Sequence, residues 1–407
     1  MSLSPARTAA AVTAAGLLVA LTGCGASDDQ GSATGAKLTM YAHSSSPAED
    51  ETLKKAIDSY NKRGRNTVSL KILPEYDTAL QTALAGGEPP DVFYLNDNKL
   101  PDMAKNGVLE PVGDKIDNPD DIYPSLRESF TYDGVHYCPA KDFSTLQLVY
   151  DTEAFDKAGV EPPTTWDELA AVAKKLSEKD RPALSFNPEF YRWGVFLAQA
   201  GAWPTDDDVS RMTMDDPKMR TALEHVAKLH ADGQAATPQQ LGVNWGGEAL
   251  GKGKAAMTIE GNWVVGAMET DFPDVKYAVA ELPAGPAGKA TMAFSVCYGV
   301  AAASKHKAAA IDLVTYLTSP EQQLAFTKEF PVMPSRQSLA EAWLAEKPEL
   351  KAFVAGADYA KKSVFVPGFP TVIDTFNDGI QGLAKGNKKT DEVITTTQKA
   401  GEDVLGG

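Results

Sequence analysis

The segment KLTMYAHSSSPAEDETLKKAIDSYNKRGRNTVSLKIL, Lys37 to Leu73, decides the fold class of this chain. Short strands are predicted at its two ends, Leu38 to Ala42 and Thr67 to Leu73. A stretch of helical periodicity separates them. Strand-helix-strand units of this kind build parallel sheets, so the segment predicts the first crossover of an α/β fold.

Capping residues mark where the helix between these strands begins. Ser46 is a favourable N-cap, and Pro47 suits the first helical position because its missing N–H has no partner there. Leu53, Ile57 and Tyr60 then recur at helical spacing and predict one buried face.

The same alternation continues along the chain, which predicts an α/β protein throughout. Further strands are expected at 91–95, 255–260 and 275–280, and further helices begin at 166, 217 and 320.

Length and charge limit the possible classes of protein. The chain has 407 residues, enough for two domains of ordinary size. With 39 basic and 55 acidic residues its net charge is −16, which argues against an extended nucleic-acid surface. No stretch after the N-terminus is long and apolar enough to predict a membrane span.

The N-terminus has the pattern of an export signal. Arg7 precedes an apolar run, Ala9 to Leu21, which is too short to span a bilayer. The run ends in Leu21-Thr22-Gly23-Cys24, which resembles a bacterial lipobox. This resemblance implies a signal peptide over 1–23 and lipid on Cys24, including palmitate. Residues 24–36 would then be the lipidated cysteine and a flexible Gly/Ser-rich tether. An ordinary secretory peptide with an incidental cysteine is the alternative.

Motifs for metals, cofactors and catalysis are missing from the sequence. It has no Cys-x-x-Cys, no His-Glu-x-x-His, no Gly-x-Ser-x-Gly and no P-loop, so neither a metal nor a cofactor is expected. Abundant carboxylates leave a glycosidase pair open. Cys138 and Cys297 remain as a pair that could form a disulfide in an oxidising compartment.

Several tryptophans lie in segments that also carry polar residues, which suggests a carbohydrate-binding site. Trp263 follows a predicted strand end in Ile-Glu-Gly-Asn-Trp, where open α/β sheets place ligands. Aromatic faces pack on the C–H faces of sugars, and carboxylates and amides bind their hydroxyls. Core packing is the alternative for each tryptophan.

Five runs together resemble the extracytoplasmic solute-binding proteins of ABC importers, family 1, the maltose-binding-like sugar-binding group. They are TALAGGEPPDVFYLND (82–97), MAKNGVLEPV (103–112), VHYCPAKDFSTLQLVYDTEAFDKAGVEPPTTWDEL (135–169), GKGKAAMTIEGNW (251–263) and FPVMPSR (330–336). The resemblance implies a two-lobe periplasmic-binding-protein fold of type II, the Venus flytrap, with the ligand cleft between discontinuous lobes.

The resemblance also implies a division of the chain. Residues 37–141 with 298–336 would form the N-terminal lobe, and 142–297 with 337–407 the C-terminal lobe. Segments near 139–145, 294–298 and 334–339 would cross between them, with Cys138 and Cys297 beside neighbouring crossings.

Ligand-binding residues follow from the same motifs, one by one. The candidates are Tyr41, Ser45, Glu75, Tyr76, Asp97, Asn98, Asp142, Phe143, Ser144, Phe190, Trp193, Trp245, Glu260, Asn262, Trp263, Tyr298 and Phe369.

The implied function is binding without catalysis. A lipid-anchored monomer on the outer face of the membrane would capture a carbohydrate, expected to be an oligosaccharide, and deliver it to the permease subunits. Another solute such as a polyamine, a peptide or a chelated metal, a secreted glycosidase, and a surface sensor or adhesion lipoprotein are the alternatives.

Overall fold

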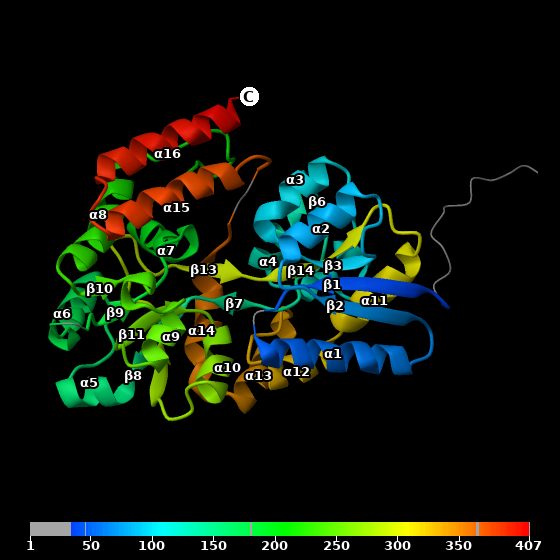
Figure 1. Ribbon diagram of the computed structural model, residues 1–407, viewed down its shortest axis with the longest axis horizontal. Helices are drawn as coiled ribbons and strands as arrows, with labels where there is room; N and C mark the ends of the chain where they lie inside the picture. The colour runs from blue at the N-terminus through cyan, green and yellow to red at the C-terminus, as the bar shows by residue number, and fades with distance from the viewer. Residues whose placement is uncertain (1–33, 45, 180, 364–365, 407) are drawn as a thin grey trace, which may run out of the picture.

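The computed structural model describes residues 34–44, 46–179, 181–363 and 366–406. These residues form two lobes, each built on a five-stranded mixed sheet with helices around it (Figure 1). The predicted α/β class is confirmed. The predicted signal peptide, Cys24 and Ser45 lie outside the described residues. Within the described part, no helix has the length and apolar character needed to cross a membrane.

The first sheet contains the opening strand-helix-strand unit. The Ser46 side chain accepts a hydrogen bond from the Glu49 N–H at the start of α1, and the two flanking strands pair in parallel. We call this body the β1 lobe. Its sheet has the order β2 (Thr67–Ile72), β1 (Lys37–Ala42), β3 (Val92–Asn96), β14 (Val296–Ala301) and β4 (Leu109–Glu110). Its helices are α1 (Pro47–Lys62), α2 (Tyr76–Ala85), α3 (Leu100–Lys105), α4 (Pro124–Ser129), α11 (Lys307–Leu317) and α12 (Pro320–Glu329).

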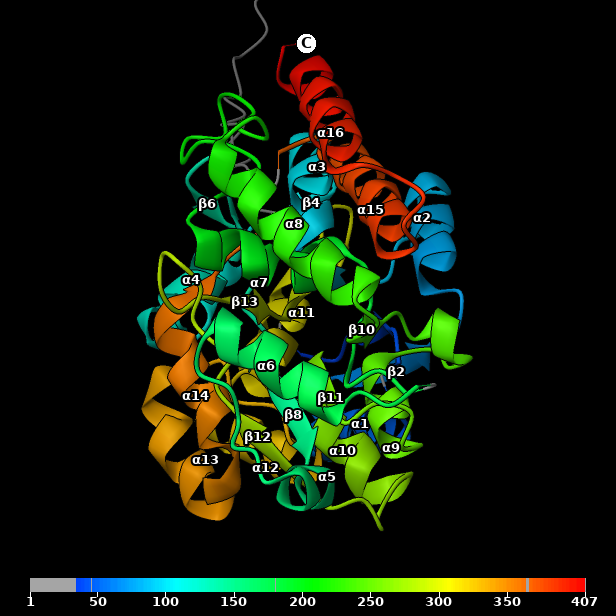
Figure 2. The ribbon, with the colours of Figure 1, turned by 90° about the vertical axis from the view of Figure 1, so that its left-hand side faces the viewer.

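The second sheet forms the β8 lobe. Its order is β10 (Ala235–Ala236), β9 (Leu184–Ser185), β11 (Met257–Glu260), β8 (Gln147–Asp151) and β12 (Tyr277–Ala280). Figure 2, which looks at this lobe, shows α6 and α8 on the near side and α15 and α16 at the top. The helices are α5 (Thr152–Ala158), α6 (Trp166–Leu176), α7 (Phe190–Ala200), α8 (Pro217–Ala231), α9 (Gly246–Gly251), α10 (Trp263–Thr270), α15 (Pro370–Ala384) and α16 (Thr390–Leu405).

Three segments run side by side between the lobes. The middle crossing segment consists of residues 139–145. On one side of it, the Lys141 N–H donates a hydrogen bond of 2.8 Å to the Val296 carbonyl. On its other side, Phe143 exchanges two backbone hydrogen bonds with Met333, of 2.8 and 3.0 Å. The second crossing is β13 (Thr291–Phe294) running into β14, where Phe294 also pairs with Ser144 of β7 (Ser144–Thr145) (Figure 1). Residues 330–336 form the third.

Two hydrophobic cores lie under the two sheets, and they meet at α10. The β1-lobe core includes Phe93 and Tyr94, and the β8-lobe core includes Trp193 and Phe196. Helix α10 directly follows β11 of the second sheet, yet its buried side chains pack into the first core. The remaining helices, α13 (Ala340–Glu346) and α14 (Lys351–Gly356), follow the third crossing, and α14 contacts β7 and β8.

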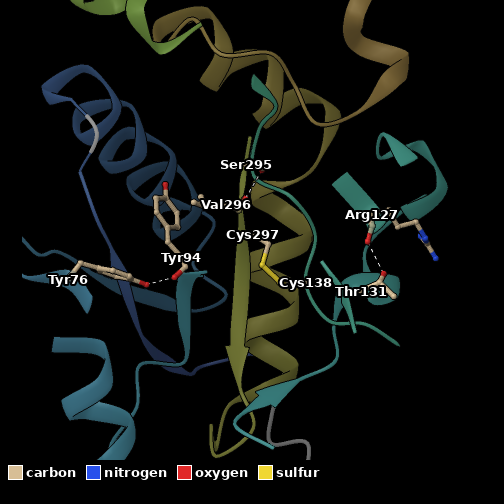
Figure 3. Close-up of a disulfide and its surroundings, with 8 residues drawn as sticks. All are labelled: Tyr76, Tyr94, Arg127, Thr131, Cys138, Ser295, Val296 and Cys297. Atoms are coloured by element: carbon tan, nitrogen blue, oxygen red, sulfur yellow. Dashed lines mark hydrogen bonds between the residues drawn. A yellow bond between two sulfur atoms is a disulfide. The ribbon is translucent and has the colours of Figure 1, made fainter. Parts of the chain in front are cut away.

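A disulfide joins Cys138 to Cys297 beside these crossings. Their Cα atoms are 5.6 Å apart, and the bond links β14 to the start of the middle crossing segment (Figure 3). Both cysteines are buried. The bond closes a loop with a sequence separation of 159 residues, so it restricts the unfolded chain over a long stretch.

Replacing both cysteines, Cys138→Ala with Cys297→Ala, is expected to lower the free energy of unfolding by about 2–4 kcal/mol, because the unfolded chain regains loop entropy. Urea unfolding of the purified, oxidised protein with and without reductant would measure this, and the double variant should not respond to reductant. Alkylation of both cysteines in unreduced protein, detected by peptide mass spectrometry, would contradict the bond.

Candidate functional site

A cleft of about 200 Å³ lies where the crossing segments meet the two lobes. The β1 lobe contributes His43, Glu49 and Asn96, and α10 contributes Trp263. The crossing segments contribute Lys141, Asp142, Ser144, Phe294, Ser295, Val296, Phe330 and Val332. A second cavity of about 360 Å³ adjoins it, since His43 and Asn96 line both, and Glu75 and Tyr76 form part of its wall.

A buried ion cluster forms the floor of this cleft. The Lys141 Nζ is 2.7 Å from Glu49 Oε1 and also contacts Asp142 Oδ2. Burial alone would lower the pKa of Lys141, but the Asp142 and Glu49 carboxylates outweigh it and raise that pKa. Burial raises the pKa of Asp142, although Lys141 opposes the rise. The cluster therefore offers carboxylate oxygens to the cleft while its one lysine is already neutralised by acids.

A histidine completes the polar wall on the β1-lobe side. His43 packs edge-on against Tyr76 and Tyr94, with ring centroids 5.3 and 5.4 Å apart. Burial lowers the pKa of His43, so its ring is neutral at pH 7 and can both donate and accept hydrogen bonds.

The Trp263 indole is held in place by groups behind it. Its Nε1–H donates to Glu260 Oε2 over 3.1 Å, and Glu260 is in turn paired with Arg192. Gly261 is required between them, because a Cβ there would collide with the Trp263 ring. Glu260 is completely buried, and this desolvation raises its pKa against the effect of Arg192. The ring is thus fixed from behind while it stays half-buried at the cleft.

Asn262 connects this tryptophan to the middle crossing segment. Its backbone N–H donates to Ser144 Oγ over 3.0 Å, and its Nδ2 donates to the Phe143 carbonyl over 3.1 Å. These bonds fix Trp263 relative to Asp142 and Ser144.

Aromatic rings continue from Trp263 across the cleft. Trp263 meets Phe294 edge-on at 5.3 Å, and Phe294 meets Tyr191 of α7 at 4.7 Å. The Tyr191 hydroxyl then donates to Asp97 Oδ1 over 3.1 Å, which reaches the β1 lobe at the end of β3. Burial raises the pKa of Asp97 to about 7. Asp97 also lines a third cavity, of about 470 Å³, beyond this contact.

The structure brings many of the predicted residues together. Those at or directly behind the two adjoining cavities are Glu75, Tyr76, Asp142, Ser144, Glu260, Asn262 and Trp263. Asp97 and Asn98 lie at the neighbouring lobe contact.

Other predicted residues lie elsewhere. Phe190, Trp193 and Phe369 are buried in the β8-lobe core, and Phe143 and Tyr298 are buried in the β1-lobe core. For α7 the reason is helical phase, because Phe190, Trp193 and Leu197 share its buried face. Phe143 turns toward Tyr123 because alternate side chains of an extended segment point to opposite sides.

Two predicted aromatics remain half-buried outside these cavities. Tyr41 of β1 lies under the Lys71 ammonium, 5.2 Å from its ring centroid. Trp245 packs its ring over Gly247 at the start of α9.

Several cleft residues were missed, chiefly His43, Glu49, Lys141, Tyr191 and Phe294. Tyr191 could have been found, since the helical stripe that buries its neighbours leaves it on another face. Lys141 and Glu49 are 92 residues apart, and local sequence carries no sign of their pairing. Within the described residues, no group of three or more His, Cys, Asp or Glu side chains is placed to hold a metal ion.

Comparison with solved structures places this fold among known binding proteins. The chain superposes on the GacH receptor of Streptomyces glaucescens with a TM-score of 0.82 and 24% identity, covering 91% of this chain and 98% of that one. An ABC substrate-binding protein from Listeria monocytogenes, solved in complex with cycloalternan, superposes with a TM-score of 0.81 and 25% identity. The match covers 91% of this chain and 99% of that one.

Sequence comparison identifies the family. The chain is 27% identical over 355 residues to the diacetylchitobiose binding protein DasA of Streptomyces coelicolor, covering 81% of this chain and 82% of that protein. The family model described as bacterial extracellular solute-binding protein matches residues 55–352, most of the chain. The chain therefore belongs to the bacterial extracellular solute-binding protein family, whose members bind solutes and are not enzymes.

Proposed function

We propose that the protein binds a carbohydrate, an oligosaccharide, outside the cell and delivers it to the permease of an ABC transporter. The observation that carries this proposal is the half-buried Trp263 ring beside Asp142 and Ser144. An indole face packs on the C–H face of a sugar ring, and the neighbouring oxygens bind its hydroxyls. The diacetylchitobiose and cycloalternan proteins support the same class of ligand.

The two adjoining cavities suit a ligand of more than one unit. One lies against Trp263 and Phe294, and the other extends along Glu75 and Tyr76 at the start of α2. Both are rich in acceptors, and their one lining lysine, Lys141, is already paired. A neutral polyhydroxyl ligand therefore fits this wall better than an anionic one.

Binding would act by closing the lobes. Groups from both lobes line the cleft, so a ligand contacts both only when they approach each other. Such contacts favour the closed form by differential affinity, and the closed form would dock on the permease.

The lobe boundaries and the anchor belong to this proposal. We assign 37–141 with 298–336 to one lobe and 142–297 with 337–407 to the other, which is supported by the chain crossing near 141, 297 and 336. Lipid on Cys24 would tether a monomer to the outer face of the membrane, close to its permease.

Trp263→Ala is expected to weaken binding of the cognate sugar by more than tenfold, about 1.4 kcal/mol or more, because the stacking face is removed. A thermal-shift screen of neutral oligosaccharides would identify that sugar, and titration calorimetry would compare the variants.

Trp203→Ala is the matched control, because Trp203 is also half-buried but packs on Phe190 away from the cleft. It should leave the affinity unchanged. Equal affinity of Trp263→Ala and wild type would refute the stacking role, and a response to polyamines but to no sugar would refute the ligand class.

Cys24→Ser is expected to abolish incorporation of labelled palmitate and to move the protein from the membrane fraction to the soluble fraction. Metabolic labelling followed by cell fractionation measures both. A membrane-bound, labelled Cys24→Ser protein would show that the anchor lies elsewhere.

A further inference from the structure

The two lobes touch each other directly through side-chain hydrogen bonds. The Tyr191 hydroxyl on α7 of the β8 lobe donates to Asp97 Oδ1, which follows β3 of the β1 lobe. A second bond on the same side joins the Gly368 N–H, just before α15, to Asp102 Oδ1 of α3 over 3.2 Å. Opening the lobes would have to break both contacts.

The Asp97 carboxyl has no basic side chain paired with it among the residues that the structure describes. Its acceptor bonds come from the Tyr191 hydroxyl and the Asn98 N–H. Asp97 lines the 470 Å³ cavity together with Arg127, Glu128, Asp133 and Lys362. Two other charged residues, Lys99 and Asp102, follow Asp97 closely in the chain. On the other lobe, Glu189 precedes α7, close to Tyr191 in the sequence.

Several of these charged neighbours form ion pairs with residues other than Asp97. Arg127 pairs with Asp114, Lys362 with Glu128, and Lys99 with Asp77. Glu189 pairs with Arg192. In the closed form the Asp97 carboxyl is therefore partly withdrawn from water without gaining a counter-charge.

We propose that the Asp97–Tyr191 hydrogen bond is a latch between the lobes and that closing it takes up a proton at Asp97. A carboxylate loses more by leaving water than a neutral carboxyl does, and the neutral form can still accept the tyrosine O–H. Acidity thus favours the closed protein even before any solute binds. The inference rests on the proposed function only in requiring lobes that open and close.

The expected pH range follows from the two states of this group. In the closed form burial raises the pKa of Asp97 to about 7, whereas in water an aspartate titrates at about 3.9. The closed form therefore binds more protons between about pH 4 and pH 7. The ratio of closed to open protein should rise on the order of tenfold to a hundredfold from pH 8 to pH 5.

Small-angle X-ray scattering of the protein without added sugar, from pH 8 to pH 5, would test this latch. Wild type should contract as the pH falls. Asp97→Asn, which is neutral at every pH, should show a radius of gyration that does not depend on pH. Tyr191→Phe, which lacks the donor, should stay more open than wild type across the range.

Asp133→Asn is the matched control, because it removes a carboxylate from the same cavity without touching the lobe contact. It should contract like wild type. A wild-type radius that does not change with pH, or an Asp97→Asn protein that still contracts, would overturn the proposal. Since no sugar is present, failure of the carbohydrate assignment would leave these measurements unaffected.

Discussion

The hydrogen bonds that hold the middle crossing segment between its two neighbours are the constraint on which the rest of this structure depends. Residues 139–145 pair with Val296 on one side and with Met333 on the other, so backbone hydrogen bonds and isolated β-bridges join the three connections between the lobes. These connections also line the cleft. Because successive side chains of the extended middle segment point to opposite sides, Asp142 and Ser144 face the cleft while Phe143 faces the core.

Buried charge makes this floor rigid as well as polar. Lys141 lies between two carboxylates and near the rings of Tyr94 and Phe326, at 5.3 and 5.0 Å from their centroids. Removing Lys141 would leave two buried carboxylates without a counter-charge, which costs several kcal/mol. Behind Trp263, Arg192 and Glu260 form a second buried ion pair. The wall of the cleft is therefore held in place by a buried ion pair on each side.

Local signals predicted the fold well, and the site only in part. The Ser46-Pro47 start gave the first helix, and its flanking strands gave the parallel pair, because caps and periodicity act over a few residues. Trp263, Asp142 and Ser144, which line the cleft, were predicted because they lie in recognisable motifs. Tyr191 was missed although helical phase places it on another face of α7, and the motif-based choice of Phe190 and Trp193 selected core residues. The contact of Lys141 with Glu49 is set by tertiary packing, which local patterns do not encode.

The disulfide has a mechanical consequence. Cys138 and Cys297 close a covalent loop that contains β7 to β13, the whole second sheet included, whereas the chain outside it enters and leaves through neighbouring strands. A pulling force applied at the chain ends would pass across the sulfur–sulfur bond and bypass the looped residues. As long as the bond is intact, residues 139–296 are shielded from tension that is applied between the two chain ends.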